Sequence, residues 1–113
     1  MIIPLSPTNV GRIWLAADSR YTIRSLREHL ERYPHIGWMS AEGGDYIVGG
    51  YWKDRPPIGL IVEASASPQR GALAQRLLQS FAESGSELAV LSEREAAQAL
   101  PLYLALGFTA LEE

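Results

Sequence analysis

Three short apolar runs in the middle of the chain restrict its fold more than any other feature. They span residues 36–41, 46–52 and 58–64, and each has the length and composition of a β-strand. The segments between them, at residues 42–45 and 54–57, are rich in glycine, proline and acidic residues and are too short to hold a helix. Strands joined so closely run antiparallel. The sequence therefore predicts an antiparallel meander at the centre of the fold.

The third of these runs is the most apolar. It reads Ile-Gly-Leu-Ile-Val over residues 58–62, with no polar residue to mark a solvent face. A strand with two apolar faces is typical of the interior of a sheet that is covered on both sides. We therefore expect residues 58–64 to form the central strand.

Two helices are predicted between a short N-terminal strand at residues 2–5 and the meander. Residues 6–9 combine an N-cap candidate with proline at a favourable position, and apolar residues at helical spacing then extend to Ala17. Thr22 can cap the second helix, and Pro34 ends it. The residues at helical spacing are Val10, Ile13, Trp14 and Ala17 in the first helix and Ile23, Leu26, Leu30 and Tyr33 in the second.

The C-terminal half alternates helices and strands. A helix includes residues 73–81, a buried strand spans 88–91, a second helix covers 93–106 and stops at Gly107, and a last strand is expected at 108–111. The complete order is β-α-α-β-β-β-α-β-α-β, so a right-handed strand–helix–strand crossover follows the meander. The sequence predicts a mixed α/β sheet.

The composition excludes several classes of protein. The 113 residues, of which 47% are hydrophobic, are enough for one domain. There are no cysteines and two histidines, which excludes disulfide scaffolds and structural zinc sites, so we expect no metal. The basic residues are scattered among thirteen acidic ones, which argues against a nucleic-acid partner. No apolar run is long enough to span a membrane and no signal peptide pattern is present, so we expect a cytoplasmic protein.

The segment after the central strand is a candidate anion-binding loop. Residues 64–72 are mostly small and lead into a helix, whose unpaired N–H groups and positive dipole end suit a pyrophosphate. The alternative is an ordinary strand-to-helix connection whose alanines simply favour helix. Both interpretations remain open on this segment alone.

The same loop resembles the coenzyme A loop of the GNAT superfamily of N-acetyltransferases. That loop follows the pattern Gln/Arg-x-x-Gly-x-Gly/Ala and leads into a helix with a Leu-Leu pair; Gln69, Ala72 and Ala74 fall into register, followed by Leu77 and Leu78. Ala72 replaces the first glycine and puts a methyl group where backbone and phosphate come closest. The resemblance implies coenzyme A contacts from Gln69, Arg70, Gly71, Ala72, Leu73, Ala74 and Gln75 and from the backbone of Val62 and Ala64.

A second segment, residues 99–108, looks like the family's Ala-x-x-x-Tyr-x-x-x-Gly-Phe segment. In the family the tyrosine lies near the thioester sulfur and can protonate the leaving thiolate, which implies that catalytic role for Tyr103. A phenol is protonated at neutral pH and can supply this proton. The alternative is a half-buried helix residue with its hydroxyl in water. Ala96 stands where the family often has asparagine.

The acceptor side of the fold offers further candidates. Glu63 is the only acid on the central strand, so it is the candidate catalytic base for the attacking amine. On an alternating strand it would point away from Val62 and Ala64 and serve as a solvated or salt-bridged carboxylate. Arg20 and Tyr21, on the turn between the two predicted helices, are candidate substrate-binding residues. We interpret Trp14 and Trp38 as core residues and His29 and His35 as surface residues.

The resemblance covers nearly the whole chain. It implies one GNAT-like domain over residues 1–113, with an acceptor side at 1–53, a coenzyme A-binding core at 58–108, and a mostly antiparallel mixed sheet flanked by about four helices. GNAT domains usually close with a hairpin after the Gly-Phe segment, and residues 109–113 leave room for one strand. We expect the closing strand to be absent, which favours a homodimer or a chain that is part of a longer protein.

The function implied by the resemblance is acetyl-coenzyme A-dependent transfer of an acetyl group directly to a small-molecule or peptide amine. The alternative is a non-catalytic GNAT-like module that binds acyl-coenzyme A or pairs with another domain of a larger protein. Ala72 and Ala96 favour the module. Release of free thiol from acetyl-coenzyme A distinguishes the two.

Overall fold

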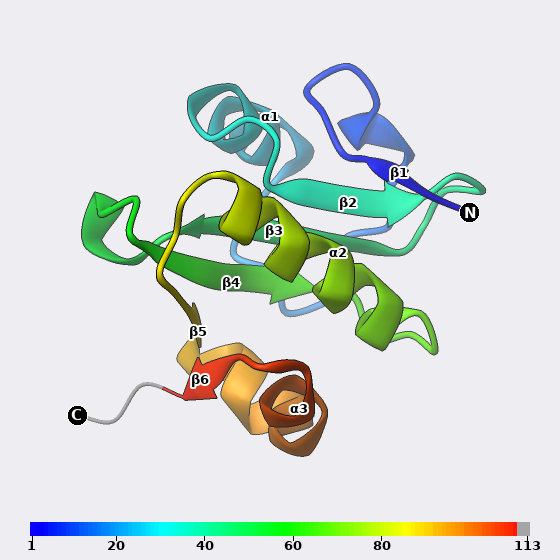
Figure 1. Cartoon of the computed structure of the whole chain (residues 1–113). Coiled ribbons are helices and arrows are strands. Elements are labelled where there is room, and N and C mark those ends of the chain that lie inside the picture. Colours follow the sequence, from blue (N-terminus) through cyan, green and yellow to red (C-terminus); the bar gives the residue numbers. More distant parts are fainter. Residues whose placement is uncertain (111–113) are drawn as a thin grey trace.

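The computed structural model of the chain describes residues 1–110, which form a mixed sheet of six strands (Figure 1). The strands are β1 (Ile2–Pro4), β2 (Gly37–Ser40), β3 (Tyr46–Tyr51), β4 (Ile58–Ala64), β5 (Leu88–Leu91) and β6 (Thr109–Ala110), and they lie side by side in this order. β1 to β4 pair antiparallel, whereas β5 is parallel to β4 and β6 is parallel to β5. The predicted meander and the α/β class are confirmed.

Three α-helices form within residues 1–110, close to predicted positions. They are α1 (Ile23–Arg32), α2 (Arg70–Glu83) and α3 (Glu93–Leu106). α1 begins at Thr22, whose hydroxyl accepts a hydrogen bond from the Ser25 amide at 3.1 Å. α3 ends at Gly107, whose φ of 111° is a conformation that favours glycine.

The helix predicted from the signals at residues 6–9 and extending to Ala17 is wrong. Only a short 3-10 turn, η1 (Val10–Arg12), forms there, so three α-helices flank the sheet instead of about four. After this turn the chain is extended: Ile13 pairs with Gly44, and the Trp14 amide donates to the Gly44 carbonyl at 3.0 Å. These tertiary bonds outweigh the weak helical preference of the segment. Trp14, predicted to be a core residue, is 80% exposed.

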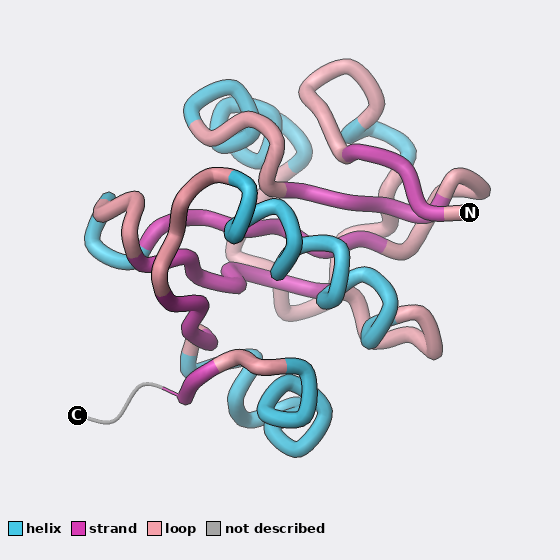
Figure 2. The backbone as a smooth tube through the Cα atoms, in the orientation of Figure 1, coloured by secondary structure: helices cyan, strands magenta, loops and turns pink. Residues whose placement is uncertain are grey.

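The helices cover both faces of the sheet. α2 runs across β2 and β3 on one face (Figure 2), where α2 and α3 enclose a core that includes Ile61, Leu77 and Phe81. α1 and η1 cover the other face through Leu26 and Val10. Gly59 lets α2 approach closely, because a Cβ atom there would lie 2.6 Å from the Phe81 ring.

β4 lies between β3 and β5, as predicted for the central strand. The two faces of β4 are not covered equally, however. Ile61 faces α2 and is fully buried, whereas Leu60 and Val62 are half-buried. The expectation that both faces are fully covered is therefore wrong for the face that bears Leu60 and Val62.

A β-bulge interrupts the alternation of β4. Val48 lies opposite Glu63 and Gly49 lies opposite Ile61, so Val62 has no partner of its own on β3. The extra residue brings the side chains of Val62 and Glu63 to the same face, where both line one cavity. The expectation that Glu63 points away from Val62 is corrected by this bulge.

The C-terminal strand begins one residue later than predicted. The strand expected at residues 108–111 forms as β6 at Thr109–Ala110, and Leu111 lies outside the described residues. Among the helices of residues 1–110, none is long and apolar enough to cross a membrane.

Candidate functional site

The carboxyl end of β4 separates from β5. The two strands pair up to Ile61 and Leu91, and β4 then continues to Ala64 while the other chain segment turns into α3. Ser92 makes this turn, because its amide donates to the Ile61 carbonyl at 3.2 Å and its hydroxyl accepts from the Glu95 amide at 3.3 Å. The first turn of α3 therefore lies beside the end of β4.

Glu63 is the centre of a buried polar cluster at this strand end. It is 1% exposed. One carboxylate oxygen accepts from the Tyr46 hydroxyl at 2.7 Å and the Ser19 hydroxyl at 2.8 Å, and the other pairs with the Arg94 guanidinium. Arg94 also reaches Asp18 at 2.8 Å. A buried carboxylate needs such partners; the salt-bridged interpretation is confirmed and the solvated one is wrong.

This cluster shifts the proton affinities of its members. Burial, with a smaller contribution from Glu63, raises the pKa of Tyr46 above its ordinary value. Burial alone lowers the pKa of the Arg94 guanidinium, but attraction to Glu63 and Asp18 outweighs it and the pKa is raised. Tyr46 keeps its proton and Arg94 its charge at neutral pH, so both donate to Glu63. The role of Glu63 as a catalytic base stays a prediction. To take a proton from an amine, its carboxylate has to give up hydrogen bonds from these donors.

Glu95 forms a second buried cluster beside Ala64. Glu95 is 0% exposed, and its two carboxylate oxygens accept from the Ala64 amide at 3.0 Å and from the Tyr103 hydroxyl at 2.7 Å. The Ala64 amide lies beyond the end of the β4–β5 ladder, where no β5 carbonyl can reach it. Glu95 thus takes the place of a strand partner.

Tyr103 is fully buried, which corrects the interpretation that its hydroxyl lies in water. Its ring packs edge-on against Phe108 with 5.8 Å between ring centroids, and its hydroxyl is enclosed with Glu95. Burial, together with the hydrogen bond to Glu95, raises the pKa of Tyr103 above its ordinary value. Its catalytic acid role stays a prediction, and the hydroxyl has to leave Glu95 to perform it.

Two cavities flank Arg94, which lines both. The larger one, of about 360 Å³, lies beyond the end of β4 and is bordered by Ala64, Trp14 and Asp45. The smaller one, of about 250 Å³, contains four residues that the sequence analysis selects: Arg20, Tyr21, Val62 and Glu63. Burial, with a smaller contribution from Glu63, raises the pKa of the Tyr21 phenol. The candidate acceptor residues and the candidate base therefore meet in one cavity.

The first turn of α2 leaves two backbone amides free. The Ser67 hydroxyl accepts from the Gln69 amide at 3.0 Å, and the Ser67 carbonyl accepts from the Arg70 amide at 3.1 Å. The amides of Gly71 and Ala72 take part in none of the hydrogen bonds found among residues 1–110. They are the free donors of a helix N-terminus, the kind of group that binds phosphate.

The remaining residues of the predicted coenzyme A loop face elsewhere. Leu73 and Ala74 are fully buried in the core. Ala72 and Gln75 line a separate hollow of about 340 Å³ that also contacts Ile2 of β1. The predicted coenzyme A side chains are therefore not gathered on one surface, because Leu73 and Ala74 lie in the core whereas Ala72 and Gln75 are exposed.

Sequence reasoning missed several residues that assemble the site. Arg94 and Glu95 are predicted only as helix residues, and Tyr46 only as a strand residue. The Ser-x-x-Glu pattern at residues 92–95 predicts a helix N-cap, but it gives no signal that the glutamate is buried. Arg94 and Glu63 lie 31 residues apart, and no local pattern connects them.

The two histidines differ in position. His29 is half-buried, with Nε2 2.8 Å from the Gly49 carbonyl oxygen and its ring 5.7 Å and 5.1 Å from the rings of Tyr21 and Tyr33. Its prediction as a surface residue is wrong. His35 is exposed, as predicted.

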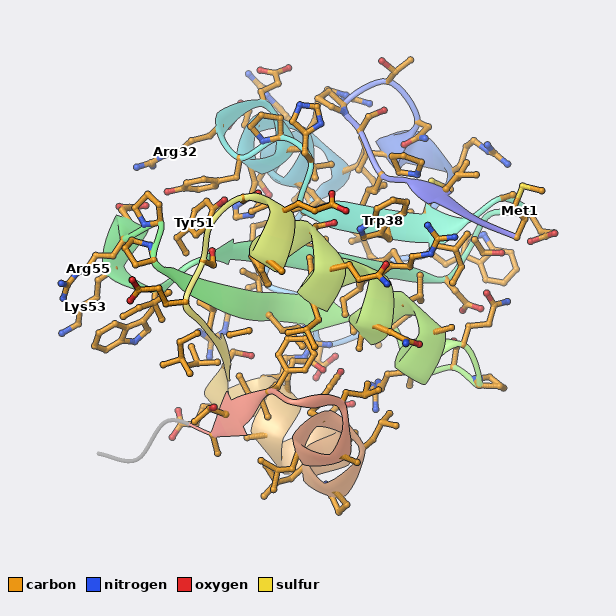
Figure 3. All side chains as sticks on the ribbon, viewed as in Figure 1. Met1, Arg32, Trp38, Tyr51, Lys53 and Arg55 are labelled. Atoms are coloured by element: carbon orange, nitrogen blue, oxygen red, sulfur yellow. The ribbon has the colours of Figure 1, made fainter. Side chains whose placement is uncertain are left out.

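Other findings delimit the site. Residues 1–110 contain no group of three or more histidine, aspartate or glutamate side chains placed to hold a metal ion. Lys53 and Arg55 project from the far end of β4, away from α3 (Figure 3).

Comparisons of the chain with models of protein families and with curated proteins find no match.

Proposed function

We propose that the chain is an acetyl-coenzyme A-dependent N-acetyltransferase with a GNAT-type fold, which transfers the acetyl group directly to an amine. The observation that carries this proposal is the separation of β4 from β5 after Ile61, which leaves the last residues of β4 beside no β5 strand. The loop that follows leads straight to free amides at the start of α2. A long ligand with an acyl group at one end and a pyrophosphate at the other suits this arrangement.

The anionic end of coenzyme A fits the residues present. Gly71 and Ala72 offer unpaired amides at the positive end of α2, and Arg70 lies in the same turn. The acyl end fits less well in this conformation, because the Ala64 amide, which the sequence resemblance assigns to the ligand, is held by Glu95. The proposed complex therefore requires a rearrangement near Ala64.

The proposed reaction forms a C–N bond as the C–S bond of the thioester breaks. The amine gives up a proton and the departing sulfur gains one, so a base and an acid are needed. Glu63 is the proposed base because it shares the smaller cavity with Arg20 and Tyr21, where the amine would bind. Tyr103 is the proposed acid, and its raised pKa keeps the phenol protonated.

A non-catalytic module is the second candidate function. The buried Tyr103 hydroxyl favours it, because a phenol that donates to Glu95 has no free proton for a thiolate. Such a module would bind acyl-coenzyme A through the start of α2 and catalyse nothing.

Two measurements test these functions. Calorimetric titration is expected to detect acetyl-coenzyme A binding, and small amines or peptides are expected to release free thiol from it. Binding without thiol release supports the module. Absence of both heat and thermal shift at millimolar ligand removes both functions.

A matched pair of variants tests where the pyrophosphate binds. Gly71→Asp places a carboxylate beside the free amides, and its charge is expected to weaken acetyl-coenzyme A binding about tenfold or more. Ala82→Asp adds the same charge to an exposed position near the other end of α2 and should leave binding unchanged. Equal weakening in both variants would contradict the proposed location.

A further inference from the structure

The first turn of α3 occupies the strand end that the proposed function needs to be open. Glu95 takes both donors that the acyl ligand is expected to meet, the Ala64 amide and the Tyr103 hydroxyl. Arg94, its neighbour, stands between the two cavities and pairs with Glu63. We propose that residues 93–98 form a closure over the end of β4, held shut by Glu95, which the ligand displaces. This inference rests on the proposed function and concerns the regulation of the same site.

A carboxylate is an unusual group in the position of Glu95. Acidic side chains are seldom fully buried unless a cation pairs with them, and Glu95 belongs to none of the ion pairs found among residues 1–110. Its two oxygens are acceptors that face two donors. A thioester or amide carbonyl is an acceptor of the same kind. Glu95 and a ligand carbonyl therefore compete for the same hydrogens.

Arg94 is incompletely satisfied while the turn is closed. Its guanidinium pairs with Glu63 and Asp18, but its Nε is buried and has no hydrogen-bond partner within the described part of the chain. A buried N–H without a partner carries a cost in free energy. Opening the turn exposes this group to water and recovers that cost, which offsets part of the cost of separating Arg94 from Glu63.

A break in α3 supplies the hinge for this movement. Ala99 has φ −153° and ψ 43°, outside the helical range, and Pro101 has no amide to continue the hydrogen bonds of the helix. The first piece of the helix ends at this break. The second piece is anchored in the core through Tyr103. A change of dihedral angles at one residue can thus move the first piece alone.

The test compares the natural chain with Glu95→Gln and with Glu83→Gln. Glu95→Gln keeps the size of the side chain but replaces one of its two acceptor oxygens with an NH2 donor, so it no longer offers a separate acceptor to the Ala64 amide and to the Tyr103 hydroxyl. The open state is expected to become about tenfold more populated. Glu83→Gln makes the same charge change at an exposed position of α2. Hydrogen exchange without ligand, and titration with acetyl-coenzyme A, are measured on all three proteins.

The closure predicts a local and specific result. In Glu95→Gln, amide exchange should rise about tenfold at residues 93–98 and at Ala64 and stay unchanged at residues 102–107, and acetyl-coenzyme A should bind about tenfold more tightly. Glu83→Gln should behave as the natural chain. Unchanged exchange, an equal rise along all of α3, or equal or weaker ligand binding in Glu95→Gln overturns the closure.

The failure of the proposed function gives a different result. If none of the three proteins binds acetyl-coenzyme A, that function fails, and the exchange pattern alone decides whether the turn opens.

If Glu95→Gln does not fold in a thermal unfolding experiment, Ser92→Ala replaces it, because this change removes the N-cap and loosens the same turn without altering a buried charge. The same local exchange and tighter binding are expected, and their absence overturns the closure.

Discussion

Two buried carboxylates, those of Glu63 and Glu95, lie near the end of β4, and different partners stabilise each of them. Glu63 has a guanidinium and two hydroxyls as partners, whereas Glu95 has one amide and one phenol. Because a charge that loses its partners inside a protein is costly, each carboxylate fixes the groups around it. Glu63 ties the loop that contains Ser19 to the sheet and, through Arg94, also α3, whereas Glu95 ties α3 to the sheet through the Ala64 amide.

Tyr46→Phe tests the Glu63 cluster. The change removes a donor to Glu63 and also the acceptor of the Ala16 amide, whose bond to the Tyr46 hydroxyl is 3.1 Å. We expect the free energy of unfolding to fall by about 1–3 kcal/mol, measured by urea denaturation. Tyr33→Phe is the matched control, because its hydroxyl bonds to Asp54 at an exposed position and should contribute less. Equal losses would show that the Glu63 cluster is no stronger than a surface contact.

The buried phenols predict how stability depends on pH. The pKa values of Tyr46 and Tyr103 are raised in the folded protein. A group with a raised folded pKa stabilises the fold fully below its unfolded pKa, about 10 for tyrosine, and loses this contribution as the pH rises above it. The free energy of unfolding should therefore fall above about pH 10. Urea unfolding as a function of pH measures this, and Tyr103→Phe should fall less steeply; an equal slope would contradict the prediction.

At the scale of the elements, the ends of helices that are marked by a capping residue, a proline or a glycine could be predicted. The conformation of the segment before α1 could not. Thr22 and Pro34 bound α1, and Gly107 ends α3, because capping and backbone conformation are local properties. Residues 6–17 carry the same kinds of local signal. There the pairing of Ile13 with Gly44, a contact between distant residues, decides the conformation. Periodicity alone has no information about such a partner.

In the candidate site, too, the residues marked by a local feature could be predicted, and the residues placed by contacts between distant segments could not. Arg20 and Tyr21 could be selected because a turn between two elements is a local feature, and both line the smaller cavity with Glu63. Arg94 and Glu95 could not, because their positions depend on where β5 ends beside β4. The bulge at Val62 also escaped prediction, and with it the face on which Glu63 lies.

Thr22→Ala tests the difference between the two N-terminal segments. The Thr22 hydroxyl accepts from the Ser25 amide and caps α1, so its loss should lower the free energy of unfolding by about 1 kcal/mol. Thr8→Ala makes the same change in the segment that forms no α-helix, and the free energy should stay within about 0.5 kcal/mol of the natural value. Chemical denaturation of both variants provides the measurement. A larger effect at Thr8 than at Thr22 would contradict the prediction.

At the scale of the whole molecule, the homodimer stays a prediction. Leu88, Leu102 and Leu104 are 43%, 37% and 49% exposed at the end of the molecule that carries β5 and α3. We expect sedimentation to detect a dimer at tens of micromolar, and Leu104→Glu to weaken it because it places a charge at an exposed apolar position of α3. Arg12→Glu, an exposed change on η1, is the control. A monomer at these concentrations would contradict the prediction.

The order of the strands bears on how the chain folds. β1 to β6 lie in the sheet in the order of the sequence, so each strand pairs only with strands adjacent to it along the chain. The longest gaps between partners are those that contain α1, α2 or α3, and each helix shortens its gap as it forms. Strands that are consecutive in the sequence close shorter loops when they pair than strands from distant parts of a chain would, which lowers the entropic cost of pairing. The sheet can grow one strand at a time as the chain leaves the ribosome, without waiting for a distant segment to be synthesised.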